Sequence, residues 1–120
     1  MNSGPRASVK VREHRGCWVL DVEGQADFDE GDVLRSAMEE TNGKTLPAMV
    51  IDLSALTFAD TAFLHWLLEA HRAHENAGTL LILAGPLSPQ VVRLLTITGT
   101  IDHFTVAGDI EAALVLAGSS

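Results

Sequence analysis

Two apolar runs on either side of a helical segment constrain the fold of this chain more than any other feature. The first run covers residues 47–53 and the second covers residues 80–84. Nearly continuous apolar runs of this length are typical of strands that are covered on both faces, and such strands usually lie parallel to their neighbours. Between the two runs, residues 61–77 place apolar side chains at helical intervals. A strand, a crossover helix and a second strand in this order predict a parallel sheet.

The rest of the chain continues this alternation of strand and helix patterns. Apolar and polar residues alternate around Val9 and again over residues 18–23, with a tight turn at 14–16, so the chain is predicted to open with a β-hairpin. Helical spacing runs from residue 33 to about Gly43, and again after Ser88-Pro89, an N-cap followed by proline at the first helical position. A short strand at 104–106 and a last helix capped by Asp109 complete the order β-β-α-β-α-β-α-β-α.

This order predicts an α/β fold with a mixed, largely parallel sheet whose helices pack mainly on one face. A length of 120 residues fits one domain. We place that domain at residues 8–116 and expect loose termini at 1–7 and 117–120. Gly78, directly after the long helical segment, is expected to end that helix.

The charge balance and the hydropathy exclude two classes of partner. With 16 acidic and 8 basic side chains, the chain has a formal net charge of −8. An acidic chain without a basic run repels a phosphate backbone, so no nucleic acid is expected as a partner. No uninterrupted apolar stretch approaches the roughly 20 residues of a membrane helix, and the first residues form no apolar signal core. We therefore expect a cytoplasmic protein without direct membrane insertion.

The familiar catalytic and metal-binding motifs are missing from the sequence. It lacks a glycine-rich phosphate loop, a nucleophile elbow and a Cys-x-x-Cys pair. His71 and His74 could share one helix face, but no further ligand is spaced to complete a zinc site, so a solvated helix face is the favoured interpretation. The acidic residues at 27–32 lead into a helix, whose N-terminal dipole favours negative charge. We expect no enzymatic activity, no metal and no cofactor.

Asp52 lies near the end of the predicted central strand and raises the alternative of a phospho-accepting receiver domain. Such a domain needs a lysine after its last strand, and this chain has none beyond Lys44. We expect Asp52 to support neighbouring backbone instead. An enzyme that uses Asp52 or the acidic cluster stays an open alternative, and it predicts a pocket in which Asp52 faces solvent.

The joint between the central strand and the following helix carries the best candidate for a functional residue. Asp60 stands where an N-cap is expected, and Thr61 follows as the first helical residue. A hydroxyl at this position is exposed, and an attached phosphate would meet backbone donors and the positive end of the helix dipole. Two interpretations remain open from the residues alone. Thr61 is either a helix-start residue without chemistry or an acceptor for a phosphate.

Residues 50–61 resemble the signature of the STAS domain, the fold of bacterial anti-sigma factor antagonists. In that family an aliphatic strand and Asp-Leu lead to Asp-Ser or Asp-Thr at the start of a helix, as Asp52-Leu53 and Asp60-Thr61 do here. Residues 24–27, Gly-Gln-Ala-Asp, are similar to the family's Gly-Glu-Leu-Asp. Later features follow in the family's order, so the resemblance covers about residues 8–116.

The resemblance implies a regulator that acts by binding protein and has no catalysis of its own. In the family, a partner that is both anti-sigma factor and serine/threonine kinase, of the histidine-kinase-like ATPase type, phosphorylates the hydroxyl residue after the aspartate. The unphosphorylated antagonist binds that partner and frees the sigma factor. Carried over to this chain, the phosphoacceptor is Thr61 and the neighbouring acid is Asp60. The implied partner-binding residues are Asp27, Asp60, Thr61, Ala62 and Phe63.

The chain departs from the family pattern directly after the acceptor. The family commonly has Ser, then Ser or Thr, then Gly, where this chain has Thr61, Ala62 and Phe63. Threonine as acceptor resembles two other kinds of STAS protein, the scaffold subunits of stress-signalling assemblies and the STAS subunit of a lipid transporter. A non-switching subunit of either kind is therefore the alternative. Phe63 is expected either to be buried or to form part of a partner-binding patch.

Overall fold

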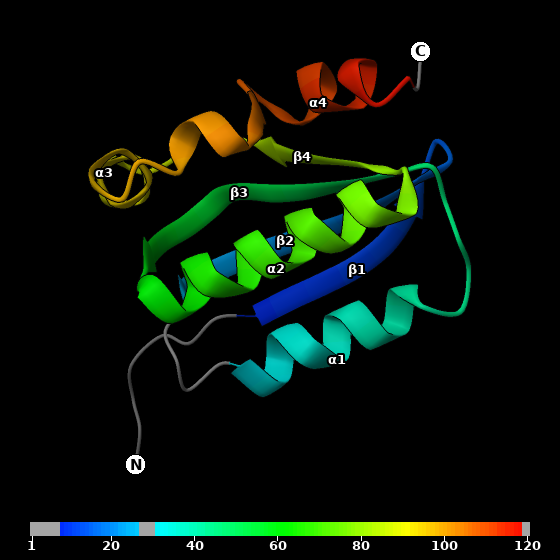
Figure 1. The fold of residues 1–120 in the computed structure, drawn as a ribbon, viewed down its shortest axis with the longest axis horizontal. Helices are drawn as coiled ribbons and strands as arrows, with labels where there is room; N and C mark the ends of the chain where they lie inside the picture. Colours follow the sequence, from blue (N-terminus) through cyan, green and yellow to red (C-terminus); the bar gives the residue numbers. More distant parts are fainter. Residues whose placement is uncertain (1–7, 27–30, 119–120) are drawn as a thin grey trace.

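The fold is described from a computed structural model, which covers residues 8–26 and 31–118 (Figure 1). Its centre is a five-stranded sheet in the order β1-β2-β3-β4-β5. β1 pairs antiparallel with β2, and the other neighbours pair parallel. This arrangement confirms the predicted mixed, largely parallel sheet. In chain order the elements are β1 (Ser8–His14), β2 (Cys17–Ala26), α1 (Gly31–Thr41), β3 (Ala48–Ala59), α2 (Thr61–Ala77), β4 (Leu80–Ala84), α3 (Pro89–Ile97), the 3-10 helix η2 (Ile101–His103), β5 (Thr105–Ala107) and α4 (Ile110–Leu116).

The chain opens with the predicted hairpin between β1 and β2. Arg15 and Gly16 form its turn, and both have positive φ angles, of 54° and 78°. Two residues with positive φ give the turn a twist that matches the twist of the flanking strands. Across the hairpin, Arg12 Nε donates to a carboxylate oxygen of Asp21 at 3.0 Å.

The helices divide unequally between the two faces of the sheet. Buried residues of α1, α2 and α3 form one apolar core with one face of the sheet, and α4 packs on the other face. Figure 1 shows α1 and α2 on one side of the strands and α4 on the opposite side. The expectation that the helices lie mainly on one face is therefore confirmed. The smaller second core is built mostly from short side chains, among them Ala48, Ala84 and Ala113.

β3 is longer than the sequence pattern predicted. The apolar run ends at Leu53, but the strand continues to Ala59, so Asp52 lies near its middle and not near its end. The pairing explains the difference. β4 flanks β3 only as far as the pair Asp52–Ala84, whereas β2 follows β3 to its last residue. The second half of β3 is thus partly exposed, with Leu56 and Ala59 still buried.

Candidate functional site at the start of helix α2

Asp60 is the single residue between β3 and α2, and it caps the helix as predicted. Its backbone is extended, with φ −106° and ψ −175°, and its side chain accepts a hydrogen bond from the backbone N–H of Phe63 at 3.0 Å. The helix then runs over Thr61–Ala77, the predicted range, and Gly78 ends it with a positive φ of 75°. A cap of this kind fixes the direction in which the first helical residues project.

The three residues of the first helical turn have different environments. Thr61 and Ala62 are exposed, whereas the Phe63 side chain is only 2% exposed. Phe63 belongs to the larger core and stacks on Trp66, with ring centroids 5.6 Å apart. Of the two alternatives for Phe63, the structure has the buried one. Phe63 anchors the helix from inside, and Thr61 and Ala62 form the surface.

A side chain from α3 fixes the other flank of this joint. The Gln90 amide donates to the Ala59 carbonyl oxygen at 2.8 Å, and its Oε1 accepts from the Ala59 N–H at 2.8 Å. β4 no longer flanks β3 at this position, so Gln90 supplies the hydrogen bonds that a further strand would make. The residue before Asp60 is thereby held on both sides. The sequence carries no local signal for this contact, which joins residues 31 apart.

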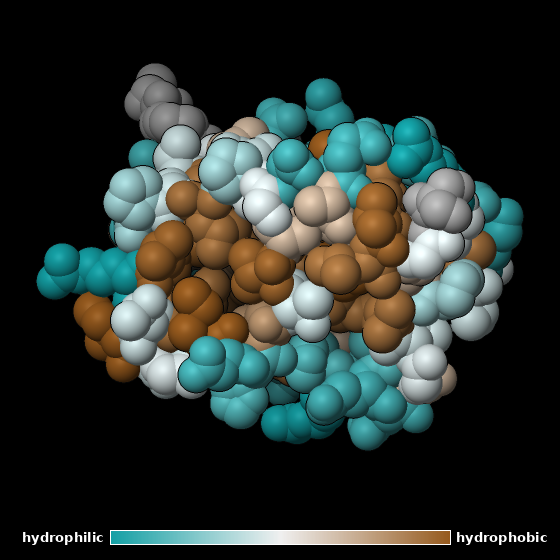
Figure 2. Space-filling model, turned by 90° about the horizontal axis from the view of Figure 1, so that it is seen from above, coloured by the Kyte–Doolittle hydropathy of each residue, from teal (hydrophilic) through white to brown (hydrophobic). Residues whose placement is uncertain are grey.

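Exposed apolar side chains lie on β3 and α3, the two elements that Gln90 joins next to Asp60. Phe58, three residues before Thr61, is 40% exposed. On α3, Val92 and Ile97 are 38% and 70% exposed and line a shallow groove together with Leu87 and Arg93. Figure 2, which looks down on the α3 and α4 side of the molecule, shows apolar residues gathered over this face. Sequence reasoning missed Phe58 and α3 as parts of the surface around the site, because exposure is not visible in a short apolar pattern.

Three other predictions concern Asp27, Asp52 and the pair His71 and His74. Asp27 lies outside the described residues. Asp52 accepts a hydrogen bond from the Ser54 N–H at 2.9 Å, which confirms its predicted role as a support of neighbouring backbone. The histidine pair departs from the predicted solvated face, because His74 is half-buried and its Nδ1 lies 2.7 Å from the Thr79 hydroxyl.

Two further observations concern metals and membranes. Across residues 8–26 and 31–118, no three His, Cys, Asp or Glu side chains gather closely enough to hold a metal ion. In the same part of the chain, no helix combines the length and the apolar character needed to cross a membrane.

Comparison with known proteins identifies the family. The model of the STAS domain matches residues 8–113. The chain therefore belongs to the STAS domain family, as its sequence resemblance implied. No curated protein matches the chain.

Solved structures of similar shape include anti-sigma factor antagonists. One from Mycobacterium paratuberculosis is 26% identical, with a TM-score of 0.81, and the match covers 93% of this chain and 94% of that one. The anti-sigma factor antagonist SpoIIAA in its unphosphorylated form is 18% identical, with a TM-score of 0.75 and coverage of 92% and 97%. A sulfate transporter family protein from Wolinella succinogenes is 22% identical, with a TM-score of 0.75 and coverage of 89% and 88%.

Proposed function

We propose that this protein is an anti-sigma factor antagonist that binds an anti-sigma factor with serine/threonine kinase activity and is switched off by phosphorylation of Thr61. The single observation that carries the proposal is the exposed Thr61 at the start of α2, directly after the capping residue Asp60. The similarity to the Mycobacterium paratuberculosis antagonist supports this role. So does SpoIIAA, which has been solved in both an unphosphorylated and, from Bacillus, a phosphorylated form.

In this proposal, catalysis of the phosphoryl transfer belongs to the partner. Phosphoryl transfer from ATP needs a metal-bound nucleotide and a group that positions the hydroxyl. The described side chains supply an acceptor at Thr61 and a carboxylate at Asp60 that is engaged with the helix backbone, but no metal cluster. A histidine-kinase-like ATPase fits this division, because it brings nucleotide, magnesium and catalytic groups to an exposed hydroxyl. The antagonist itself is then no enzyme and needs no cofactor.

Phosphorylation at Thr61 would weaken such a complex for an electrostatic reason. A phosphate adds about −1.5 to −2 charges, here one residue from Asp60 and on a chain of net charge −8. Before modification, a basic face on the partner would complement this acidity. The apolar side chains of Phe58 and Val92 would supply the surface that is buried on binding. After modification, the new charge would have to be desolvated within that surface.

A second function stays open because of the residues after the acceptor. The switching members commonly have Ser as the acceptor, then Ser or Thr, and then Gly. This chain has Thr61, Ala62 and Phe63 at these three positions. The similarity to a sulfate transporter family protein, with a TM-score of 0.75, also supports this alternative. In this alternative the chain is a non-switching STAS subunit of a stress-signalling assembly or of a lipid transporter.

Binding measurements with two substitutions at Thr61 separate the two functions. Candidate histidine-kinase-like proteins encoded in the same genome serve as partners, and the affinity of each is measured for the wild type, Thr61→Ala and Thr61→Glu. Thr61→Ala is expected to bind like the wild type, and Thr61→Glu to bind at least about fivefold more weakly, a loss of ~1 kcal/mol. Asn76→Glu is the matched control, since it adds a charge to the same helix roughly 22 Å away.

Incubation of the wild type with each candidate and ATP, followed by mass spectrometry, then locates the phosphate. Modification at Thr61 supports the switch. Equal affinity of the two Thr61 variants, or modification only at other residues, would favour the non-switching subunit.

A further inference from the structure

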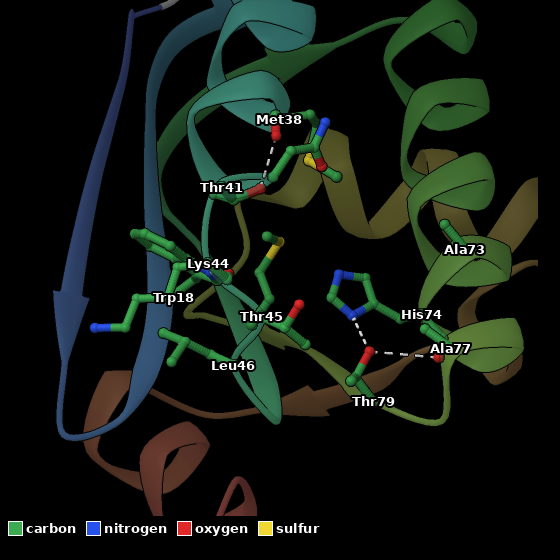
Figure 3. Close-up of a pocket in the computed structure, with 12 residues that line it drawn as sticks. Trp18, Met38, Thr41, Lys44, Thr45, Leu46, Ala73, His74, Ala77 and Thr79 are labelled. Atoms are coloured by element: carbon green, nitrogen blue, oxygen red, sulfur yellow. Dashed lines mark hydrogen bonds between the residues drawn. The ribbon is translucent and has the colours of Figure 1, made fainter.

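A small pocket lies at the far end of α2 from Thr61. It has a volume of about 210 Å³ and opens between the C-terminal turns of α1 and α2. Figure 3 shows its labelled side chains converging from α1, α2, the start of β2 and the loop before β3. Its apolar lining consists of Trp18, Met38, Leu46, Met49, Ala73 and Ala77. None of these residues belongs to the proposed site for the kinase.

The size of the pocket limits what can bind. A protein cavity of roughly 150 Å³ lined by apolar side chains accommodates benzene. A volume of about 210 Å³ therefore suits a molecule slightly larger than one six-membered ring. A nucleotide or a lipid chain would leave most of its atoms outside this volume. The thioether of Met38 and the indole of Trp18 both favour contact with an aromatic ring over contact with a flexible chain.

Hydrogen bonds hold one wall of the pocket in place without a ligand. The Trp18 Nε1–H donates to the Lys44 carbonyl oxygen at 3.0 Å, and the Lys44 ammonium group contacts both carboxylate oxygens of Glu13, at 3.0 and 3.1 Å. The loop that carries Lys44 is thus tied to the β1–β2 hairpin. At the end of α1, the Thr41 hydroxyl donates to the Met38 carbonyl oxygen at 2.7 Å. A pre-formed pocket binds a small ligand without the cost of ordering its walls.

His74 gives the pocket a directional polar group. Its Nδ1 lies 2.7 Å from the Thr79 hydroxyl, and that hydroxyl donates to the His74 carbonyl oxygen at 3.4 Å. In the neutral tautomer whose Nδ1–H donates to the Thr79 hydroxyl, the hydroxyl proton serves the carbonyl contact and the lone pair lies on Nε2. A ligand that donates a hydrogen bond to Nε2 selects this tautomer. In Figure 3 the ring projects from α2 into the pocket, with the nitrogen that does not bond Thr79 on the open side. Burial, followed by the charge of His71, lowers the pKa of His74, which keeps the ring neutral near pH 7.

We propose that this pocket binds a small planar aromatic molecule that carries one N–H or O–H donor, such as an azole or a phenol. The ring lies against Trp18 and the methionine side chains, and the donor hydrogen-bonds to Nε2 of His74. The combination of a ring-sized apolar volume and the inward-facing Nε2 of His74 carries the proposal. It assigns to this chain a second, small-molecule site, independent of any protein partner at Thr61.

A pair of matched ligands tests the role of the hydrogen bond. Indole and benzofuran are bicyclic aromatics of the same size, and only indole has an N–H donor. Each is titrated into the ¹⁵N-labelled full chain, and amide chemical shifts are followed by NMR. We expect shifts centred on residues of the pocket, Trp18, Thr41, His74 and Thr79, and an affinity for indole about threefold to tenfold higher than for benzofuran. Equal affinities, or shifts centred on α3, would overturn the proposal.

Substitutions in α2 test the location independently. Ala77→Leu fills the pocket from an exposed position, so the shifts caused by indole are expected to disappear, whereas Asn76→Leu, one residue earlier and outside the lining, is expected to leave them unchanged. His74→Phe keeps a ring but removes the acceptor, so indole and benzofuran should bind it equally. Retention of indole binding by Ala77→Leu, or of the preference for indole by His74→Phe, would contradict the proposal.

Discussion

The two ends of helix α2 differ in how far their side chains are buried, and this difference decides what each end can bind. At its start, Phe63 is 2% exposed and stacks on Trp66, so the interior is filled and only exposed groups such as Thr61 are open to contact from outside. At its end, the exposed Ala73 and Ala77 line a pocket of about 210 Å³. A filled end offers a rigid surface to a macromolecule. An unfilled end offers a pocket to a small molecule.

The largest expected effect on stability comes from removal of the buried aromatic ring at the start of α2. Phe63→Ala removes a buried aromatic ring at the start of α2 and is expected to lower the free energy of unfolding by about 3–5 kcal/mol. Phe58→Ala, which removes the same side chain from a position that is 40% exposed, is expected to cost less than about 1.5 kcal/mol. Urea denaturation measures both values. Equal losses for the two variants would show that the start of α2 is not anchored by Phe63.

Removal of the contact between α3 and β3 is expected to have the next largest effect. Gln90→Ala leaves both the N–H and the carbonyl of Ala59 without the partners they have at 2.8 Å. Loss of partners for partly buried backbone groups costs about 1–3 kcal/mol. Hydrogen exchange of the Ala59 amide should accelerate in step with the loss of stability. Thr96→Ala, on an exposed position of the same helix, is the control and should change neither quantity.

Local patterns were sufficient to predict much of this fold. The range of α2, its cap at Asp60, its end at Gly78 and the cap of α3 at Ser88 each depend on a few consecutive residues, and the structure has all of them. The prediction failed for the end of β3, because its last residues are held by β2 and by Gln90, which are distant in the sequence. Short-range periodicity contains no information about such partners.

The candidate site was predictable only in part for the same reason. The exposed Thr61 and its cap follow from the Asp-Thr pair before a helical pattern. The burial of Phe63 depends on how the core is filled, so two alternatives remained open in the sequence. His74 is half-buried and lines a pocket whose other walls include the residues before β3, and a helical wheel cannot show that arrangement.

The smallest expected effect is the contribution of His74 to the pH dependence of stability. It tests the end of α2 that lines the pocket. Burial, followed by the charge of His71, lowers the pKa of His74 from its ordinary value of 6.5. As the pH falls through 6.5, the unfolded chain therefore takes up this proton before the folded protein does, and stability decreases. Once the pH is below the folded pKa, both states carry the proton and this contribution stops growing.

His74→Phe should therefore lose less stability than the wild type when the pH falls from about 7.5 towards 5, whatever its stability at neutral pH. Carboxylates titrate in both proteins, so comparison of the two slopes isolates the histidine. His65→Gln is the control, because His65 lies exposed on the same helix with Glu69 at 3.3 Å. Urea denaturation across this pH range measures the slopes. Identical slopes for wild type and His74→Phe would mean that the end of α2 opens freely to water, and the contrast between the two ends of the helix would then lose its basis.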